Sequence, residues 1–288
     1  MRERALVRVA IIGAGGNMGR RITGTLQGNP DYELRLIETS QRGRERIIEA
    51  GGAPVDQDEA FPGADVVIFA VPDKIVRLVA AEVIPLLDEG TSILFLDPAA
   101  VAAKRIPVRE DLHCFVTHPT HPPLYSLLGE EQPDARRDYW GGGLAHQSIV
   151  FAIAWGDEAQ AVEVERLASA MFAPTTNAHR ITVQQMAMLE PALTETLANG
   201  CVAVIHEGME RVIAAGVPAD ATRDFLMGHL QIGIALIFNE FSQLDWKLSE
   251  GAALALEKSR SQLFKDDWYR IFEPDAILES LRDITGGD

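Results

Sequence analysis

The sequence predicts an α/β domain built on a doubly wound parallel sheet, followed by an all-helical domain. Short apolar runs rich in β-branched residues alternate with helical patterns over roughly the first 180 residues. A glycine-rich loop closes the first of these runs, and strand signals disappear after about Val183. We therefore expect two domains, at residues 1–182 and 183–288.

The strands of the first domain are predicted from runs that are apolar almost throughout, as strands covered on both faces must be. They lie at residues 7–13, 32–38, 64–72, 92–98, 113–119 and 146–155. Helical patterns occupy residues 19–26, 44–50, 74–87 and 158–171 between them. The alternation of strand and helix predicts that the strands run parallel.

The second domain is predicted to consist of helices alone. The first helix covers residues 184–215, with Pro191 kinking it near its start, and further helices follow at 220–241, 249–263 and 275–284. The first helix is too long and too apolar for one small domain to cover. A second copy of the chain would cover it, so we expect a homodimer formed through these C-terminal helices.

The composition limits the classes of partner and compartment. The formal net charge is −16 and the sequence pI is about 4.8, so the protein repels nucleic acid and anionic lipid, and we expect neither nucleic acid nor membrane as a partner. Cys114 and Cys201 lie far apart without a metal or redox motif, which is typical of free thiols in a reducing compartment. The longest apolar stretches, such as residues 232–238, are too short to span a membrane. We therefore expect a cytoplasmic protein.

The glycine loop after the first strand has the features of a dinucleotide site. Glycines at positions 13, 16 and 19 follow a predicted strand and open a predicted helix. Such glycines allow a tight turn, close approach of the backbone to a pyrophosphate, and close packing of the helix on the strand. The helix N-terminus then favours the anion. The sequence thus predicts a Rossmann-type domain, and the expected cofactor residues of the loop are Gly13, Gly15, Gly16, Asn17, Met18 and Gly19.

An acidic residue at the end of the second strand indicates which dinucleotide binds. Glu38 lies 25 residues after Gly13, near where a carboxylate binds the hydroxyls of the adenosine ribose. It would repel a 2′-phosphate, so NAD is favoured over NADP; Arg42 and Arg44 weaken this preference without reversing it. The small residues that end the next strand allow its backbone to lie along the cofactor. They are Ala70, Val71, Pro72 and Asp73.

Two histidines end the fifth major strand, in the segment THPTHPPLY. His118 and His121 are each followed by proline, which stiffens the backbone where a parallel sheet presents its ligands. Either histidine could simply hydrogen-bond the loop, but the pairing favours a catalytic role. The residues that follow, through Gln147, are predicted to form a loop that could cover the site.

Two further candidates lie in the helical domain. Glu190 and Thr194 share a helix face, whereas Glu195 points elsewhere. Glu190 follows an apolar run, and a partly buried carboxylate needs a cation, a metal or a proton, although an exposed position is the alternative. His229 is flanked by apolar residues, which favours a place in the core over a catalytic role, but it stays a candidate.

Taken together, the glycine loop, the AVPD segment, the histidine-bearing strand end and the long helix resemble the β-hydroxyacid and 6-phosphogluconate dehydrogenase superfamily. Further segments resemble more closely the group with a phosphogluconate-dehydrogenase-like C-terminal domain, whose defined activity is D-apionate oxidoisomerase. These segments read GAGGNMG, THPTHPP, LEPALTETLA, GHLQIGIALIF and FKDDWYRIFEP. The resemblance implies carbohydrate metabolism, in which NAD oxidises the 2-hydroxyl of a small, branched sugar acid and the carbon skeleton rearranges.

One position departs from the wider superfamily, whose dehydrogenases carry a catalytic lysine with an asparagine four residues later. This chain has Glu190 and Thr194 there, and a glutamate cannot supply the positive charge that stabilises an enolate. Resemblance and spacing imply instead that His118 and Glu190 bind a divalent metal acting as a Lewis acid. Two alternatives stay open. One is a simple 2- or 3-hydroxyacid dehydrogenase with His118 or His121 as general base; the other is a sensor that binds NAD without turnover.

Overall fold

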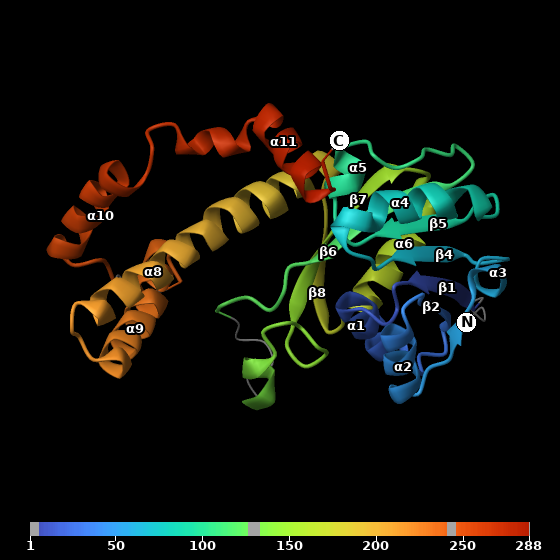
Figure 1. Ribbon diagram of the computed structural model, residues 1–288, viewed down its shortest axis with the longest axis horizontal. Helices are drawn as coiled ribbons and strands as arrows, with labels where there is room; N and C mark the ends of the chain where they lie inside the picture. The colour runs from blue at the N-terminus through green and yellow to red at the C-terminus, as the bar shows by residue number, and fades with distance from the viewer. Residues whose placement is uncertain (1–5, 126–132, 241–245, 288) are drawn as a thin grey trace. The chain divides into compact units, whose positions relative to one another are not determined.

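The computed structural model describes residues 6–125, 133–240 and 246–287 (Figure 1). The chain divides into two compact units. The sheet-bearing unit comprises Met1–Met188 with Leu278–Asp288, and the helical unit comprises Leu189–Ile277. The domain boundary expected between residues 182 and 183 falls at the start of α7 (Val183–Ala187).

The described residues of the sheet-bearing unit form one eight-stranded sheet with the order β3-β2-β1-β4-β5-β6-β7-β8. The strands are β1 Val7–Ile12, β2 Tyr32–Ile37, β3 Pro54–Val55, β4 Val66–Phe69, β5 Ser92–Phe95, β6 His113–Pro119, β7 Gln147–Trp155 and β8 Thr175–Arg180. From β1 the chain builds outward to β2 and β3 on one side and to β4, β5 and β6 on the other. The strand order thus reverses between β1 and β4, where sheets of this kind open a crevice for ligands.

The expectation that all strands run parallel is wrong at one edge of the sheet. β7 pairs antiparallel with β6, and β8 then pairs parallel with β7. An antiparallel neighbour needs no helical crossover, and the long segment between β6 and β7 lets the chain return directly beside β6. The sheet is therefore mixed, as many doubly wound sheets with an antiparallel edge are.

Helices cover both faces of the sheet, which confirms the doubly wound fold. The helices of this unit are α1 Asn17–Leu26, α2 Gln41–Glu49, α3 Gln57–Ala60, α4 Asp73–Val83, α5 Ala99–Ala102, α6 Glu158–Met171 and α7. In the core on one face, Phe69 and Phe95 stack with their ring centres 4.6 Å apart. In the core on the other face, the ring centres of Phe115 and Phe151 lie 5.7 Å apart. Because both faces are buried, β4 and β5 carry no exposed residue.

The helical unit begins in the long helix that was predicted from residue 184. After α7 the chain forms a π-helical segment, Met188–Asn199, which continues directly into α8 Gly200–Ala214. Pro191 lies inside this segment, and its carbonyl accepts a hydrogen bond from the Thr196 hydroxyl at 2.6 Å. A proline removes one backbone donor, so the wider π-turns fall where the kink was expected.

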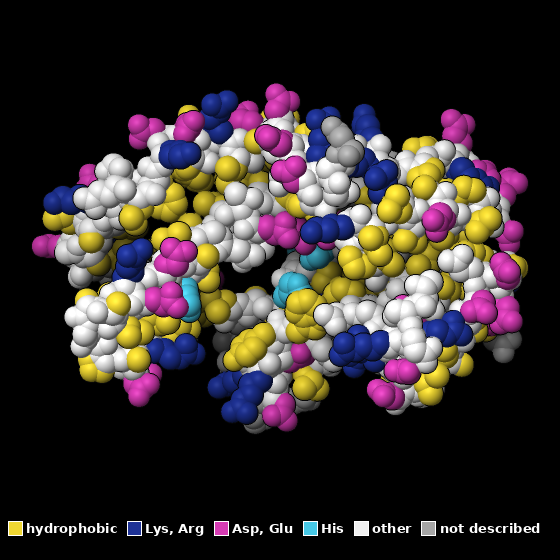
Figure 2. Space-filling model, in the orientation of Figure 1, with side chains coloured by type: hydrophobic (Ala, Val, Ile, Leu, Met, Phe, Trp, Pro, Cys, Tyr) yellow, Lys and Arg dark blue, Asp and Glu magenta, His cyan; other side chains and the backbone are white. Residues whose placement is uncertain are grey.

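The remaining helices are α9 Ala219–Ile237, α10 Glu250–Leu263 and α11 Pro274–Ile284. Neither α8 nor α10, both fully described, has a buried residue. Figure 2 shows apolar side chains at the surface over these helices. No helix within the described ranges is long and apolar enough to cross a membrane.

Candidate active site

The glycine loop between β1 and α1 is compatible only with residues that lack a side chain at its key positions. Gly13 has a φ of +79°, and a Cβ atom there would lie 2.5 Å from the carbonyl oxygen of Ala70. A Cβ on Gly19 would collide with the backbone of Gly13 and Ala14, so this glycine lets α1 pack directly on the loop. The N-cap Gly16 offers no side-chain acceptor to the first turn of α1. The first N–H groups of the helix are thus available to an anion.

Glu38 lies against this loop. Its Oε2 accepts a hydrogen bond from the Gly15 amide at 3.1 Å, and its Oε1 accepts from the amide and the hydroxyl of Ser40, both at 2.9 Å. Arg44 makes an ion pair with Asp56 at 3.1 Å, so its charge is partly compensated. The Glu38 carboxylate thus connects the glycine loop to the segment that precedes α2.

The segment after β4 forms the opposite wall of the crevice. The Ala70 amide donates to the Ile12 carbonyl at 2.9 Å, and the Ala70 carbonyl closely approaches Gly13. Pro72 is the N-cap of α4, and Asp73 is its first residue. The residues predicted for the cofactor thus lie between β1 and the first turn of α1, directly after β2, and between β4 and the first residue of α4. β1 and β4 flank the point where the strand order reverses.

His118 lies at the end of β6, next to the end of β5. Its Nδ1 is 2.7 Å from the Leu96 carbonyl oxygen, so Nδ1–H donates and Nε2 is left as an acceptor or ligand. Burial lowers the pKa of His118, and the charges of His121 and Arg21 lower it further. The hydrogen bond to Leu96 and the charge of Asp97 raise this pKa, but they do not outweigh the burial. The imidazole is therefore neutral at pH 7, as a general base or a metal ligand must be.

Asp97 and His121 complete the polar groups at this edge of the sheet. Asp97 follows β5, is half-buried, and accepts a hydrogen bond from the Ala99 amide at 2.6 Å. The ring of His121 lies 6.2 Å from the ring of His118. His121 has a φ of +57°, a conformation that is uncommon for a non-glycine residue and is typical of functional segments.

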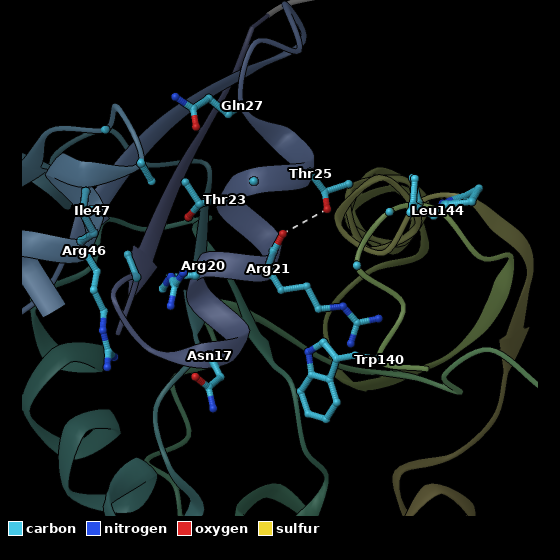
Figure 3. Close-up of a pocket in the computed structure, with 18 of the residues that line it drawn as sticks. Asn17, Arg20, Arg21, Thr23, Thr25, Gln27, Arg46, Ile47, Trp140 and Leu144 are labelled. Atoms are coloured by element: carbon cyan, nitrogen blue, oxygen red, sulfur yellow. Dashed lines mark hydrogen bonds between the residues drawn. The ribbon is translucent and has the colours of Figure 1, made fainter. Parts of the chain in front are cut away.

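The loop after the histidines brings Trp140 to this site. The His121 Nδ1 lies 3.1 Å from the Trp140 carbonyl oxygen, and the two rings lie 5.0 Å apart. Trp140 also lines a cavity of about 1220 Å³ beside α1, together with Asn17, Arg21 and Arg46 (Figure 3). Residues 126–132, part of the loop expected to cover the site, lie outside the described residues.

The sequence predictions missed Asp97, Arg21 and Trp140. Asp97 had a usable signal, because it is an acid that directly follows a buried strand. Arg21 and Trp140 had none, because a helical arginine and a tryptophan in a charged loop are ordinary features of a surface.

The two candidates of the helical unit have different surroundings. Glu190 is half-buried in the π-helical segment, while Thr194 and Glu195 are exposed. The expectation that His229 lies in the core is wrong. It is exposed on α9, stacks on Phe225 at 3.9 Å, and places its Nδ1 2.7 Å from the Phe225 carbonyl oxygen. Its apolar neighbours in the sequence are themselves largely exposed, so they bury nothing around it.

Two protein-family models match the chain. Residues 129–285 match the model described as phosphogluconate dehydrogenase (decarboxylating) C-term, and residues 6–125 match the NADPH-binding domain of acetohydroxy acid isomeroreductase. The chain is 41% identical over 279 residues to the D-apionate oxidoisomerase of Cupriavidus necator, covering 96% of this chain and 99% of that protein. It is also 41% identical, over 280 residues, to the enzyme of that name from Rhizobium rhizogenes, covering 96% and 99% of the two chains.

A solved structure has nearly the same fold. It is that of a semialdehyde dehydrogenase NAD-binding protein from Cupriavidus necator in complex with calcium and NAD. The TM-score is 0.93 at 41% sequence identity, and the match covers 98% of this chain and 100% of that one.

Proposed function

Since the chain belongs to the D-apionate oxidoisomerase family and is an oxidoreductase, we propose that it uses NAD to oxidise a small, branched sugar acid and then rearranges the carbon skeleton. The observation that carries the proposal is the pair His118 and His121, held at the strand ends beside the dinucleotide crevice. The neutral state of His118 supports it, because an imidazole must be uncharged to bind a metal ion.

The choice of NAD over NADP is supported by Glu38. Its carboxylate lies beside the glycine loop, where it can accept hydrogen bonds from ribose hydroxyls but would repel a 2′-phosphate. The nearby Arg44 is engaged by Asp56 and so is not fully available to a phosphate. The related structure from Cupriavidus necator was obtained with NAD, in agreement with this choice.

A divalent metal held by His118 and Glu190 is part of the proposal. Within the sheet-bearing unit, Asp97 follows β5, the strand beside β6, and offers a carboxylate oxygen as a further ligand. Two carboxylates and a neutral imidazole suit an ion such as Mn²⁺ or Zn²⁺, with water or substrate oxygens in the remaining positions. Because Nδ1–H of His118 donates to the Leu96 carbonyl, Nε2 is the ring atom that can bind a metal. A bound ion would act there as a Lewis acid on hydroxyl and carbonyl oxygens.

In this mechanism, Nε2 of His121 accepts the proton of the 2-hydroxyl while the hydride on the same carbon moves to the nicotinamide. Nδ1–H of His121 donates to Trp140, so Nε2 carries the lone pair. The neighbouring alkoxide then forms a carbonyl as one carbon–carbon bond migrates to the new ketone carbon. The ketone oxygen takes up a proton, so the second step is an isomerisation with no further oxidation.

Activity and metal binding test this proposal separately. NADH formation is followed at 340 nm with branched and linear sugar acids, with and without EDTA. Mn²⁺ binding is measured by calorimetry for the wild type, Glu190→Gln and the matched control Glu195→Gln. We expect EDTA to abolish activity and only Glu190→Gln to lose Mn²⁺. Activity that EDTA leaves unchanged would favour a simple hydroxyacid dehydrogenase with a histidine base, whereas NAD binding without turnover of any acid would favour the sensor.

We also propose that the protein is a homodimer through its C-terminal helices. Many large apolar side chains of the helical unit are at least 39% exposed. They include Val202, Val204, Val212, Phe225, Met227, Leu254, Leu256, Leu263 and Phe264. An apolar surface of this extent is typical of an interface. Sedimentation equilibrium should show a dimer that Leu254→Glu weakens; a wild-type monomer at micromolar concentration contradicts the proposal.

A further inference from the structure

We infer that Arg21 is a positioning residue for the paired-histidine site. From α1 it fixes the loop of residues 138–146, here named the Trp140 loop, and so holds Trp140 against His121. The inference rests on the proposed function for the role of His121. Arg21 itself lies outside that site, on α1, the helix whose N-terminus follows the glycine loop.

Arg21 is held in one orientation by two hydrogen bonds and two aromatic rings, while its Nη1, also buried, has no hydrogen-bond partner within the described residues. Only 8% of the residue is exposed. Its Nε donates to the Gly141 carbonyl and its Nη2 donates to Oε1 of Gln147, both at 2.9 Å. The guanidinium lies 5.0 Å from the centre of the Phe172 ring and 5.7 Å from that of Trp140. A buried cation needs such partners, and a planar fork satisfies two acceptors while stacking on aromatic rings.

The Trp140 loop is built to receive this side chain. Gly141 has a φ of +77°, and a Cβ atom there would lie 2.6 Å from Nη2 of Arg21, so the arginine requires a glycine at this position. The Asp138 carboxylate accepts backbone hydrogen bonds from Leu144 and Ala145, both at 3.0 Å, and from Gly142. These bonds give the loop a defined shape, but they lie within it and do not attach it to the rest of the unit. Arg21 supplies such an attachment, beside the contact of His121 with the Trp140 carbonyl and a longer bond, 3.5 Å, from Gln147 Nε2 to the Gly141 carbonyl.

Gln147 is the second anchor of the arrangement. It is the first residue of β7, is 1% exposed, and donates from Nε2 to the Phe172 carbonyl at 2.8 Å while its Oε1 accepts from Arg21. The Arg21 side chain therefore connects α1 to the Trp140 loop and to the start of β7 at the same time. Figure 3 shows Arg21 extending from α1 toward Trp140.

Trp140 passes this restraint on to His121. Trp140 is 53% exposed, so burial alone does not fix its place. The centre of its ring lies 5.7 Å from the Arg21 guanidinium and 5.0 Å from the centre of the His121 ring, and its carbonyl accepts the His121 Nδ1–H. That hydrogen bond sets the tautomer that leaves Nε2 free to act as a base. Loss of Arg21 releases the loop, and the acceptor that orients His121 is released with it.

The test is a double-mutant cycle between Arg21 and Trp140. Arg21→Met keeps the apolar stem of the side chain but removes both hydrogen bonds. Arg21→Lys keeps the charge but lacks the planar guanidinium group that donates to two acceptors. Trp140→Ala removes the indole ring. The matched control is Arg109→Met, because Arg109 also donates to two backbone carbonyls, Ile84 at 2.9 Å and Leu87 at 2.8 Å, away from the site.

We expect Arg21→Met to lower kcat/KM for the sugar acid by roughly 100-fold, the effect of misplacing a catalytic group by about 1 Å. The affinity for NAD should stay unchanged, as should kcat/KM in Arg109→Met. Arg21→Lys should restore little activity. The double variant should be no worse than Trp140→Ala, because both changes disturb the same contact. Additive losses, or a loss confined to NAD binding, would overturn the inference.

A readout without substrate separates this inference from the proposed function. Acrylamide quenching of Trp140 fluorescence is obtained by comparison with Trp140→Phe, and it should increase in both Arg21 variants. If the wild type oxidises no acid, the proposed function fails, and quenching still decides whether Arg21 holds Trp140. If Arg21→Met does not fold, Arg21→Lys supplies the same comparison. Unchanged quenching in a folded Arg21 variant would refute the positioning role.

Discussion

Removal of the Glu38 carboxylate should change which dinucleotide the protein prefers. In the structure this carboxylate accepts hydrogen bonds from the Gly15 amide and from Ser40, and we propose that it also accepts hydrogen bonds from the ribose hydroxyls. In Glu38→Ala, the Gly15 and Ser40 amides hydrogen-bond to water instead, and the oxygens that would accept from the ribose hydroxyls are lost. It also removes the negative charge that opposes a 2′-phosphate.

The magnitude follows from the bonds and their exposure. A hydrogen bond to a charged group is worth about 1.5–3 kcal/mol, and because Glu38 is only half-buried we take about 1 kcal/mol for each ribose hydroxyl. Two such bonds give about 2 kcal/mol, or a Kd for NAD raised roughly 30-fold. The Kd for NADP should fall, since its phosphate no longer meets a carboxylate.

Titration of each dinucleotide by calorimetry measures both effects. Glu45→Ala is the matched control, because Glu45 is an exposed carboxylate on α2 whose side chain contacts Gln41. It removes the same charge from the same surface and should leave both affinities unchanged. If Glu38→Ala changes the NAD affinity no more than the control does, the placement of the ribose at Glu38 is refuted.

Four further predictions concern the histidine site and the sheet. His121→Ala should lower kcat by about 100- to 10,000-fold with NAD affinity retained, and equal losses in both would point to a folding defect. Because burial lowers the pKa of His118, its neutral form persists below the ordinary value of about 6.5, so Mn²⁺ binding should not weaken as the pH falls to about 6.5; a loss of binding centred above that value contradicts the prediction. Burial raises the pKa of Asp65, but the hydrogen bonds and charge of Arg8 lower it by more, so the pKa is lowered overall. The ion pair therefore stabilises the fold above a pH of about 4, and this contribution disappears as the pH falls through the lowered pKa. Since this pair is more than a third exposed, Asp65→Asn should cost at most about 1 kcal/mol in urea unfolding at pH 7, and this cost should shrink as the pH falls below about 4. Phe115→Ala removes a ring that is 0% exposed and should cost about 3–5 kcal/mol of unfolding free energy.

Much of the fold could be predicted because its elements have strong local signals. The bounds expected for β6 and α6 match the structure, since β6 is a buried apolar run and α6 begins after Asp157, whose side chain caps the Gln160 amide. The direction of β7 could not be predicted, because strand patterning is the same for either orientation. β3 has only two residues and β8 is largely polar, so neither has the apolar run by which strands were recognised.

The candidate site was predictable where a physical demand restricts the residue type. The glycine loop and Glu38 are examples, because the close approach of Gly13 to Ala70 excludes a side chain. Arg21 is the opposite case. Its partners Gly141 and Gln147 lie 120 and 126 residues away, and nothing local distinguishes it from a solvated arginine. The prediction for His229 failed because apolar neighbours in sequence indicate burial only when another element covers them.

The most direct test of the proposed activity is the structure of the product formed from a branched sugar acid. The protein is incubated with NAD and ¹³C-labelled D-apionate, NADH is followed at 340 nm, and the carbon connectivity of the product is determined by NMR. We predict one NADH per product and a new carbon–carbon bond at the oxidised carbon. An oxidised product with the original skeleton would contradict the coupled rearrangement, and the absence of NADH would contradict the proposed oxidation of this acid.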